Sequence, residues 1–221
     1  MNKKVFKEPD GSESVFIHIP HYLSTTEKDE ILKNTKNISW DTGRVKKGNI
    51  MPRKMKWFTE THINYQFGKS PLTYLDYPDW LTNLQNKITM DYSDLIDYPL
   101  NSTLINYYEN GSNSVSWHTD DETIFPRKNH TIFSISTGEK RCFEIRRMKY
   151  KERSLSWNKH NEEAYPIDED EKDISYRFQL DDGDLLIMSG NAQLWWYHRI
   201  VKNKKLTQER INLTFRHVKK K

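Results

Sequence analysis

The segment Arg210-Ile-Asn-Leu-Thr-Phe-Arg216 decides how this chain folds. Its apolar side chains, Ile211, Leu213 and Phe215, alternate strictly with polar ones, and this period of two predicts a strand with one apolar and one polar face. Comparable short segments follow one another through residues 102–218, at a spacing that is typical of β-sandwiches and barrels. We therefore predict a mainly β fold with flanking helices.

The polar face of that strand carries Arg210 and Arg216 together with Asn212 and Thr214. Each guanidinium can form a forked pair of hydrogen bonds with a carboxylate. Beside a metal site, the two arginines could hold the two ends of a dicarboxylate such as 2-oxoglutarate. The alternative is a solvated outer face of an amphipathic strand, and the segment alone does not exclude it.

A second predicted strand, Leu104–Tyr108, places Asn106 and Tyr108 on one face. An amide and a phenol at these positions would give neutral hydrogen bonds to the same co-substrate. Ordinary core packing, with both side chains hydrogen-bonded inside the protein, is the alternative interpretation.

Three residues predict a metal site, namely His118, Asp120 and His198. Residues two apart in an extended segment project from the same face, so His118 and Asp120 can reach one metal ion. Two imidazoles and one carboxylate are the ligand set of non-haem iron(II) oxygenases, which keep other coordination positions open for a co-substrate and O₂. His-x-Asp pairs are common at protein surfaces, and the arginine strand is what favours iron here.

The composition narrows the class of protein. With 221 residues, the chain is most simply one catalytic domain, 1–221, and its many aromatic residues offset an apolar content of 35%. The net charge of +4 is weak evidence for an anionic partner. The single Cys142 excludes an internal disulfide and indicates a reducing compartment. Without a recognisable signal peptide or membrane span, we expect a monomer of the nucleus or cytoplasm, with no membrane contact.

The flanking segments are less regular than the strands. Residues 1–13 are predicted to form a frayed terminus. A capping-box pattern at residues 24–27 predicts a helix, and a second helix is predicted after Pro78. Residues 148–173, basic at first and then acidic, are interpreted as a long surface loop.

The chain resembles the AlkB family of iron(II)/2-oxoglutarate-dependent nucleic-acid demethylases across about residues 51–218. The resemblance rests on the order and spacing of Asn106-Tyr-Tyr108, Gly111, His118-Thr-Asp120-Asp-Glu122, Ser134-Ile-Ser-Thr-Gly138, Arg141-Cys-Phe143, Gly183-Asp-Leu-Leu-Ile-Met188, His198 and Arg210-Ile-Asn-Leu-Thr-Phe-Arg216. The eukaryotic branch that acts on alkylated DNA looks most similar, because of Met51-Pro-Arg-Lys54, Tyr65-Gln-Phe67 and Asp120-Asp-Glu122.

The resemblance implies a double-stranded β-helix, or jelly-roll, core in residues 100–218 and an N-terminal nucleotide-recognition lid in residues 40–70. Iron(II) would be held by His118, Asp120 and His198. The co-substrate 2-oxoglutarate would be held by Asn106, Tyr108, Arg210, Asn212, Thr214 and Arg216. The flipped base would be recognised by Tyr65, Phe67, Asp121, Glu122 and Arg53, with Phe67 stacking on it and the carboxylates favouring a cationic, methylated base.

The implied reaction is oxidative demethylation of bases of the 1-methyladenine and 3-methylcytosine type in DNA, with release of formaldehyde and succinate, and RNA stays open as a further substrate. Basic residues of the lid and of residues 146–153 would contact phosphates. The hairpin tip at residues 45–48 lacks a bulky apolar wedge, which leaves the preference between single and double strands open. The alternatives are an RNA-specific demethylase, an iron(II)/2-oxoglutarate hydroxylase of proteins or small molecules, and a catalytically silent nucleic-acid-binding module.

Overall fold

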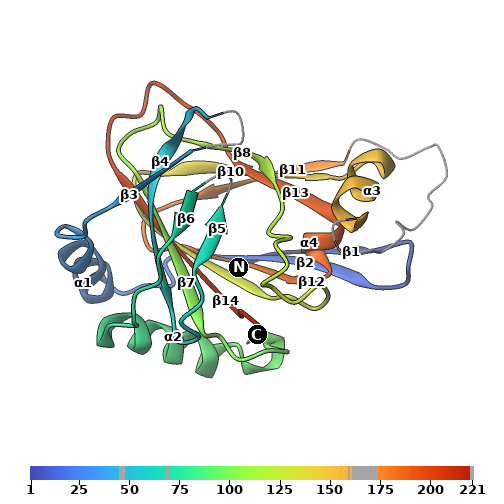
Figure 1. The fold of residues 1–221 in the computed structure, drawn as a ribbon, viewed down its shortest axis with the longest axis horizontal. Helices are drawn as coiled ribbons and strands as arrows, with labels where there is room; N and C mark the ends of the chain where they lie inside the picture. The colour runs from blue at the N-terminus through green and yellow to red at the C-terminus, as the bar shows by residue number, and fades with distance from the viewer. Residues whose placement is uncertain (45–47, 68–69, 159, 161–173, 220–221) are drawn as a thin grey trace.

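The computed structural model of the chain describes residues 1–44, 48–67, 70–158, 160 and 174–219 (Figure 1). The larger sheet contains, in spatial order, β1 (Asn2–Lys7), β2 (Glu13–Ile19), β12 (Leu185–Gly190), β9 (Ile132–Gly138), β14 (Arg210–Arg216), β7 (Ser102–Tyr108), β4 (Ile50–Thr59) and β3 (Asp41–Arg44). The smaller sheet contains β11 (Ser175–Leu180), β10 (Arg141–Arg147), β13 (Trp196–Ile200) and β8 (Val115–His118). A separate hairpin joins β5 (Tyr65–Phe67) to β6 (Ser70–Leu72).

Strand β14 lies inside the larger sheet, paired antiparallel with β7 on one side and β9 on the other. Its apolar side chains, Ile211, Leu213 and Phe215, are buried in one hydrophobic cluster. Its polar side chains line a cavity whose opposite wall belongs to the smaller sheet. The predicted strand and its alternation are therefore confirmed, and the polar face is internal rather than solvated.

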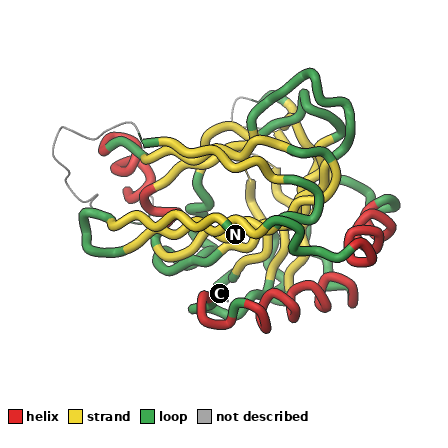
Figure 2. The backbone as a smooth tube through the Cα atoms, turned by 180° about the vertical axis from the view of Figure 1, so that it is seen from behind, coloured by secondary structure: helices red, strands yellow, loops and turns green. Residues whose placement is uncertain are grey.

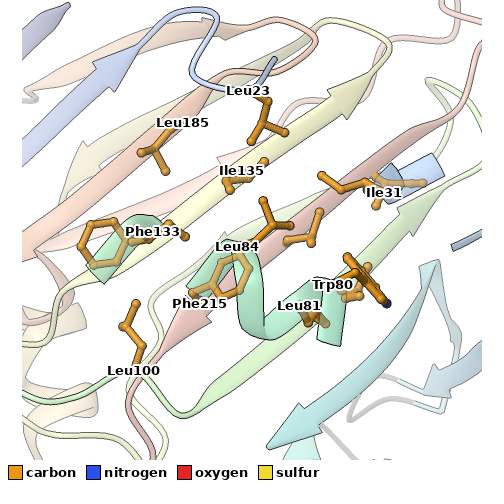
Figure 3. Close-up of a cluster of buried hydrophobic side chains, with 14 of the residues drawn as sticks. Leu23, Ile31, Trp80, Leu81, Leu84, Leu100, Phe133, Ile135, Leu185 and Phe215 are labelled. Carbon is orange, nitrogen blue, oxygen red and sulfur yellow. The ribbon is translucent and has the colours of Figure 1, made fainter. Parts of the chain in front are cut away.

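The two longest helices lie outside the strand layers (Figure 2). Helix α1 (Thr25–Thr35) begins with the predicted capping box, in which Ser24 Oγ accepts from the Glu27 backbone N–H at 3.3 Å. Helix α2 (Asp79–Asp91) starts directly after Pro78, and the short helix η1 is Ser93–Leu95. The two long helices cover one face of the larger sheet, where Figure 3 shows Ile31, Trp80, Leu81 and Leu84 beside Phe133, Ile135 and Phe215.

A second hydrophobic cluster joins the two sheets. Phe16 and Met188 from the larger sheet pack in it with Phe143, Ile145 and Phe178 from the smaller one. Two facing antiparallel sheets with a buried space between them confirm the predicted mainly β, jelly-roll fold. No helix in the described part of the chain is long and apolar enough to cross a membrane.

The prediction of a frayed terminus at residues 1–13 is wrong, because β1 pairs with β2 along its whole length. Long-range contacts fix this segment. The Phe6 ring lies 4.3 Å from the Trp196 ring, measured between centroids. Glu8 accepts hydrogen bonds from Trp196 Nε1 at 2.9 Å and from Arg147 Nη2 at 2.6 Å.

The prediction of a long loop at residues 148–173 is also wrong for its first part, because helix α3 (Tyr150–Asn158) forms there. Trp157 anchors this helix, since its ring packs edge-on against Trp195, 5.7 Å away, and its Nε1 donates to Leu194 O at 3.3 Å. Residues 161–173 lie outside the described part of the chain. Helix α4 (Ala192–Trp195) lies directly before β13.

The region predicted as a lid, residues 40–70, is partly built into the main sheet. β4 pairs with β7 over Lys54–Thr59, and β3 pairs with β4 at the edge. Residues 45–47 of the predicted hairpin tip, and residues 68–69, lie outside the described part. The lid function stays a prediction.

Candidate iron and 2-oxoglutarate site

The three predicted metal ligands meet on the inner face of the smaller sheet. His118 ends β8 and is the register partner of His198 in β13, while Asp120 follows β8 by two residues. One ligand atom from each residue lies within 4.8 Å of the others. The imidazole centroids are 4.2 Å apart. The structure thus brings together all three residues that the sequence pattern singled out.

The surroundings set the protonation of these ligands. Burial opposes the charge on Asp120, but Arg216, whose Nη1 lies 2.9 Å from Oδ2, and the two histidines lower the pKa of the carboxyl to about 2. Burial, helped by His118, lowers the pKa of His198 to about 3. Burial also lowers the pKa of His118. Near neutral pH the site therefore holds a carboxylate and neutral imidazoles, which are the forms that coordinate a metal ion.

The orientation of His118 suits coordination through one nitrogen. Its Nδ1 lies 2.9 Å from the Ser116 carbonyl oxygen, to which it donates in the tautomer that this contact favours. Nε2 then faces the site with its lone pair, 3.8 Å from Asp120 Oδ1. A backbone acceptor behind a metal-binding imidazole is the usual way in which proteins fix the ring. Two nitrogens and one carboxylate oxygen converging from one side fit iron(II).

A cavity adjoins the three ligands. Arg210, in its wall, is 1% exposed, and its Nη2 donates to Ser136 Oγ at 2.8 Å. Within the described part of the chain, its Nε and Nη1 have no hydrogen-bond partner. Burial lowers the pKa of Arg210 to about 10, so the guanidinium remains charged near neutral pH. A buried cation with donors left over is a strong site for a carboxylate.

The neutral members of the predicted co-substrate set line the same cavity. Asn212 Nδ2 donates to Ser134 Oγ at 2.8 Å and to the backbone of the same strand, while Thr214 Oγ1 donates to Asn212 Oδ1 at 3.2 Å. The Tyr108 ring lies beneath the Arg210 guanidinium, 5.0 Å from ring centroid to Cζ. These contacts hold the polar groups of β14 and β7 in fixed orientations before any ligand binds.

Known proteins match almost the whole chain. The sequence model of the 2OG-Fe(II) oxygenase superfamily matches residues 15–216. The chain belongs to this superfamily. Human alpha-ketoglutarate-dependent dioxygenase alkB homolog 3 is 31% identical over 95% of this chain and 68% of its own length. Arabidopsis thaliana DNA oxidative demethylase ALKBH2 is 28% identical over 97% of this chain and 69% of its own length.

The fold agrees with that assignment. The solved structure of OsALKBH1 superimposes with a TM-score of 0.58 at 16% identity, covering 92% of this chain and 96% of that one. A Trichoplax adhaerens prolyl hydroxylase gives a TM-score of 0.53 at 10% identity over 92% of this chain and 83% of that one. The sequence matches confirm the resemblance to the AlkB family, and this AlkB homologue is a dioxygenase. Its superfamily implies iron(II), 2-oxoglutarate and O₂, which the donor set and Arg210 fit.

Three of the residues predicted to recognise a base lie at or next to the cavity in this AlkB homologue, namely Tyr65, Arg53 and Glu122. Tyr65 and Arg53 line the cavity, and Arg53 Nε donates to Asn106 Oδ1 at 2.7 Å. Tyr65 donates its hydroxyl to Glu122 Oε1 at 2.9 Å. Burial and the charge of Asp120 raise the pKa of Glu122 to about 7. The carboxyl group of Glu122 thus lies next to the hydroxyl group of Tyr65, a residue of the cavity wall.

Asp121 has a hydrogen-bond partner in helix α3. The Asp121 carboxylate accepts a hydrogen bond from Ser156 Oγ of α3 at 2.7 Å, so it is oriented at least in part toward that helix. Phe67 ends β5, paired with Ser70, but its side chain lies outside the described part of the structure. Direct contact of either residue with a base stays a prediction.

Two of the predicted phosphate contacts are structural. Arg153 is buried, with Nη1 donating to the Met148 carbonyl, and lies over the Trp195 ring. Arg147 is ion-paired with Glu8. The aliphatic part and the planar guanidinium of an arginine both pack well against indole rings. The positive charge of these residues in the sequence does not predict this structural role.

Gln193 is a site residue that sequence reasoning missed. Its Oε1 accepts a hydrogen bond from the Asp120 backbone N–H at 2.9 Å and from Thr119 Oγ1 at 3.0 Å. Gln193 is buried in α4, just before the strand that carries His198. It therefore connects the segment that carries Asp120 to helix α4, which directly precedes the strand of His198. Nothing in the sequence around it marks this role.

Proposed function

We propose that this AlkB homologue removes methyl groups from ring nitrogens of DNA bases by oxidation, with 1-methyladenine and 3-methylcytosine as the type of substrate. The observation that carries the proposal is that the metal ligands and an incompletely paired, buried arginine share one cavity. Support comes from the relatives, one of which is named a DNA oxidative demethylase. Glu122, behind the Tyr65 wall, would favour a base that carries positive charge.

The chain's own residues prepare the reaction. Arg210 binds one carboxylate of 2-oxoglutarate, and Asn212 and Tyr108 limit the positions that this ligand can take. Arg216 keeps Asp120 ionised. When bound, iron(II) and 2-oxoglutarate supply O₂ activation, so that one oxygen atom enters the methyl group and the other enters succinate, with loss of CO₂.

The remaining step needs no further oxidant. The hydroxymethyl group on the ring nitrogen loses its hydroxyl proton, the bond between nitrogen and carbon breaks, and formaldehyde leaves. The electron pair of that bond returns to the nitrogen, so a cationic base becomes neutral. Reduction of O₂ balances two oxidations together, that of the methyl carbon and the oxidative decarboxylation of 2-oxoglutarate.

The test compares oligonucleotides that differ only in where the methyl group is attached. We expect formaldehyde, succinate and loss of one methyl mass with 1-methyladenine or 3-methylcytosine. The matched control, 5-methylcytosine, has its methyl group on carbon and should remain unchanged. DNA and RNA, single- and double-stranded, are assayed in parallel. Succinate formation without any change in methylated DNA would contradict the proposal and move the substrate to RNA, a protein or a small molecule. The intracellular location and the monomeric state stay predictions.

A further inference from the structure

The outer face of the smaller sheet carries a second cleft. Residues adjacent to inward-facing ligands point outward in a strand, so Trp117 next to His118, and Tyr197 and Arg199 beside His198, belong to this outer face. Trp117 and Arg199 both line the cleft. No residue of this cleft is used in the chemistry described above.

The charge of the cleft is positive. Among the described residues that line it, five are cations, and Glu144 is the one anion; the cations are Arg146, Arg147, Lys149, Arg177 and Arg199. Glu144 is largely buried and bridges Arg177 at 2.6 Å and Arg199 at 2.5 Å. The Arg177 side chain is nevertheless 74% exposed. The carboxylate therefore orders two arginines without covering them, which leaves N–H groups available to an anionic partner.

Aromatic rings lie among these charges. The Arg199 guanidinium lies over the Trp117 ring, 4.4 Å from its centroid, and the Arg146 guanidinium is 5.1 Å from the same centroid. Arg146 also lies over Tyr197 at 4.9 Å, and Glu152 holds it by two hydrogen bonds. Trp117 and Tyr197 are partly exposed. Indole rings and guanidinium planes in one ordered layer are surfaces on which nucleic-acid bases stack.

The cleft is connected to the iron site in two ways. Arg199 lines both cavities. Strand β8, which carries Trp117 and His118 on opposite faces, is the edge strand of its sheet. A polynucleotide that leaves the iron cavity around this edge reaches the Trp117 face without passing another strand of the smaller sheet.

We propose that the layer formed by Trp117, Arg146 and Arg199 binds an unpaired base close to the base being demethylated, while Arg177 contacts phosphate. This inference rests on the proposed function, and it specifies a single-stranded substrate. In a duplex, both faces of each base are already stacked, so a neighbouring base reaches the layer only in a single strand or after strand opening. Combined aromatic and cationic surfaces fit a polynucleotide better than an acidic peptide, which would use the charges alone.

The experiment measures binding of undamaged and methylated DNA, single-stranded and duplex, to the manganese-loaded protein with 2-oxoglutarate, so that turnover does not interfere. Base stacking on an aromatic side chain is worth roughly 1–3 kcal/mol, so Trp117→Ala should weaken single-strand binding by about tenfold. Duplex binding should change less than about twofold. Trp117→Phe, which keeps an aromatic face, should retain most of the affinity. Trp40→Ala is the matched control, because Trp40 is a partly buried indole stacked on Tyr107 in a different cleft.

Two further readouts separate stacking from charge. Replacing bases near the target one at a time by abasic residues should weaken binding to the native protein at one position, and should have no such effect in Trp117→Ala. Arg177→Gln should reduce the salt dependence of binding for both strand forms, by the amount of about one phosphate contact.

Equal losses for single strands and duplexes, or no loss in Trp117→Ala, would overturn the inference. So would a polyglutamate peptide that competes with DNA equally well in the native protein and in Trp117→Ala. If Trp117→Ala does not fold, the abasic series on the native protein still tests the inference, because the absence of a loss at any single position would overturn it. Failure of the proposed function is distinguishable, since it would appear as absent demethylation in every strand form, whereas this inference concerns binding.

Discussion

Replacing Arg210 with Met should have opposite effects on ligand binding and on the stability of the ligand-free protein. The side chain is 1% exposed, and its Nε and Nη1 have no hydrogen-bond partner among the described residues. A methionine of similar length keeps the packing against Tyr108 but removes the charge. The charge of Arg210 therefore stabilises the protein only when a carboxylate of 2-oxoglutarate is bound to it.

The magnitudes follow from the contacts. A forked pair consists of two charge-assisted hydrogen bonds of ~1.5–3 kcal/mol each, so Arg210→Met should weaken 2-oxoglutarate binding by about 10²- to 10⁴-fold. In the ligand-free protein, the variant loses the hydrogen bond to Ser136 but also removes unsatisfied buried donors, which cost ~1–3 kcal/mol. We expect its Tm to be unchanged or higher by about 2–4 °C.

The contrast is Arg216→Met. Arg216 lies 2.9 Å from the Asp120 carboxylate, so its removal leaves a buried anion without its nearest cation and should destabilise the ligand-free protein by ~3–5 kcal/mol. Both variants and the native protein are measured by calorimetric titration of 2-oxoglutarate with manganese(II) loaded, and by thermal unfolding without ligand. Native-like 2-oxoglutarate affinity in Arg210→Met, or a clear drop in its ligand-free Tm, would refute the reasoning.

Gln193→Leu should weaken metal binding by about tenfold or more, because the Asp120 backbone N–H loses its acceptor; native metal affinity by manganese titration would contradict this. Burial lowers the pKa of His130 to about 3. Between that pH and about pH 6.5, the ordinary pKa of histidine, the folded state therefore binds fewer protons than the unfolded state. The free energy of unfolding should fall as the pH falls through this range, by up to ~1.4 kcal/mol per pH unit. His130→Phe should flatten this decline in denaturant titrations at pH 7 and pH 5, and an unchanged slope would count against it. Gly111→Ala should lower Tm, because a Cβ there would lie 1.9 Å from the Asn203 carbonyl oxygen; an unaltered Tm would show that the loop yields easily.

The parts of the fold that the sequence predicts are those in which local pattern and tertiary environment agree. Strand β14 alternates with a period of two and is buried on both faces, one apolar and one polar. The capping box before α1 is complete within four residues. The meeting of the three candidate metal ligands was predictable for the same reason, since two of them lie on one extended segment and the third in a nearby strand-like segment.

The parts that the sequence does not predict depend on contacts between distant segments. Strand β1 looks like a polar terminus until Phe6 meets Trp196, and α3 looks like a charged loop until Trp157 meets Trp195. Gln193 supports Asp120 through a hydrogen bond across 73 positions of sequence. Such contacts leave no periodic signal, because each depends on one side chain placed by the rest of the fold.

The measurement that tests the central claim most directly is anaerobic titration of the protein with iron(II) and then with 2-oxoglutarate, followed by the visible charge-transfer absorption of a chelated iron(II) complex. The native protein should show the band only when both are present. His118→Ala should lose iron and the band together, whereas Arg210→Met should keep iron and lose the band at 2-oxoglutarate concentrations that saturate the native protein. A band that survives in His118→Ala, or iron bound to the native protein without any band, would contradict the assignment of this site.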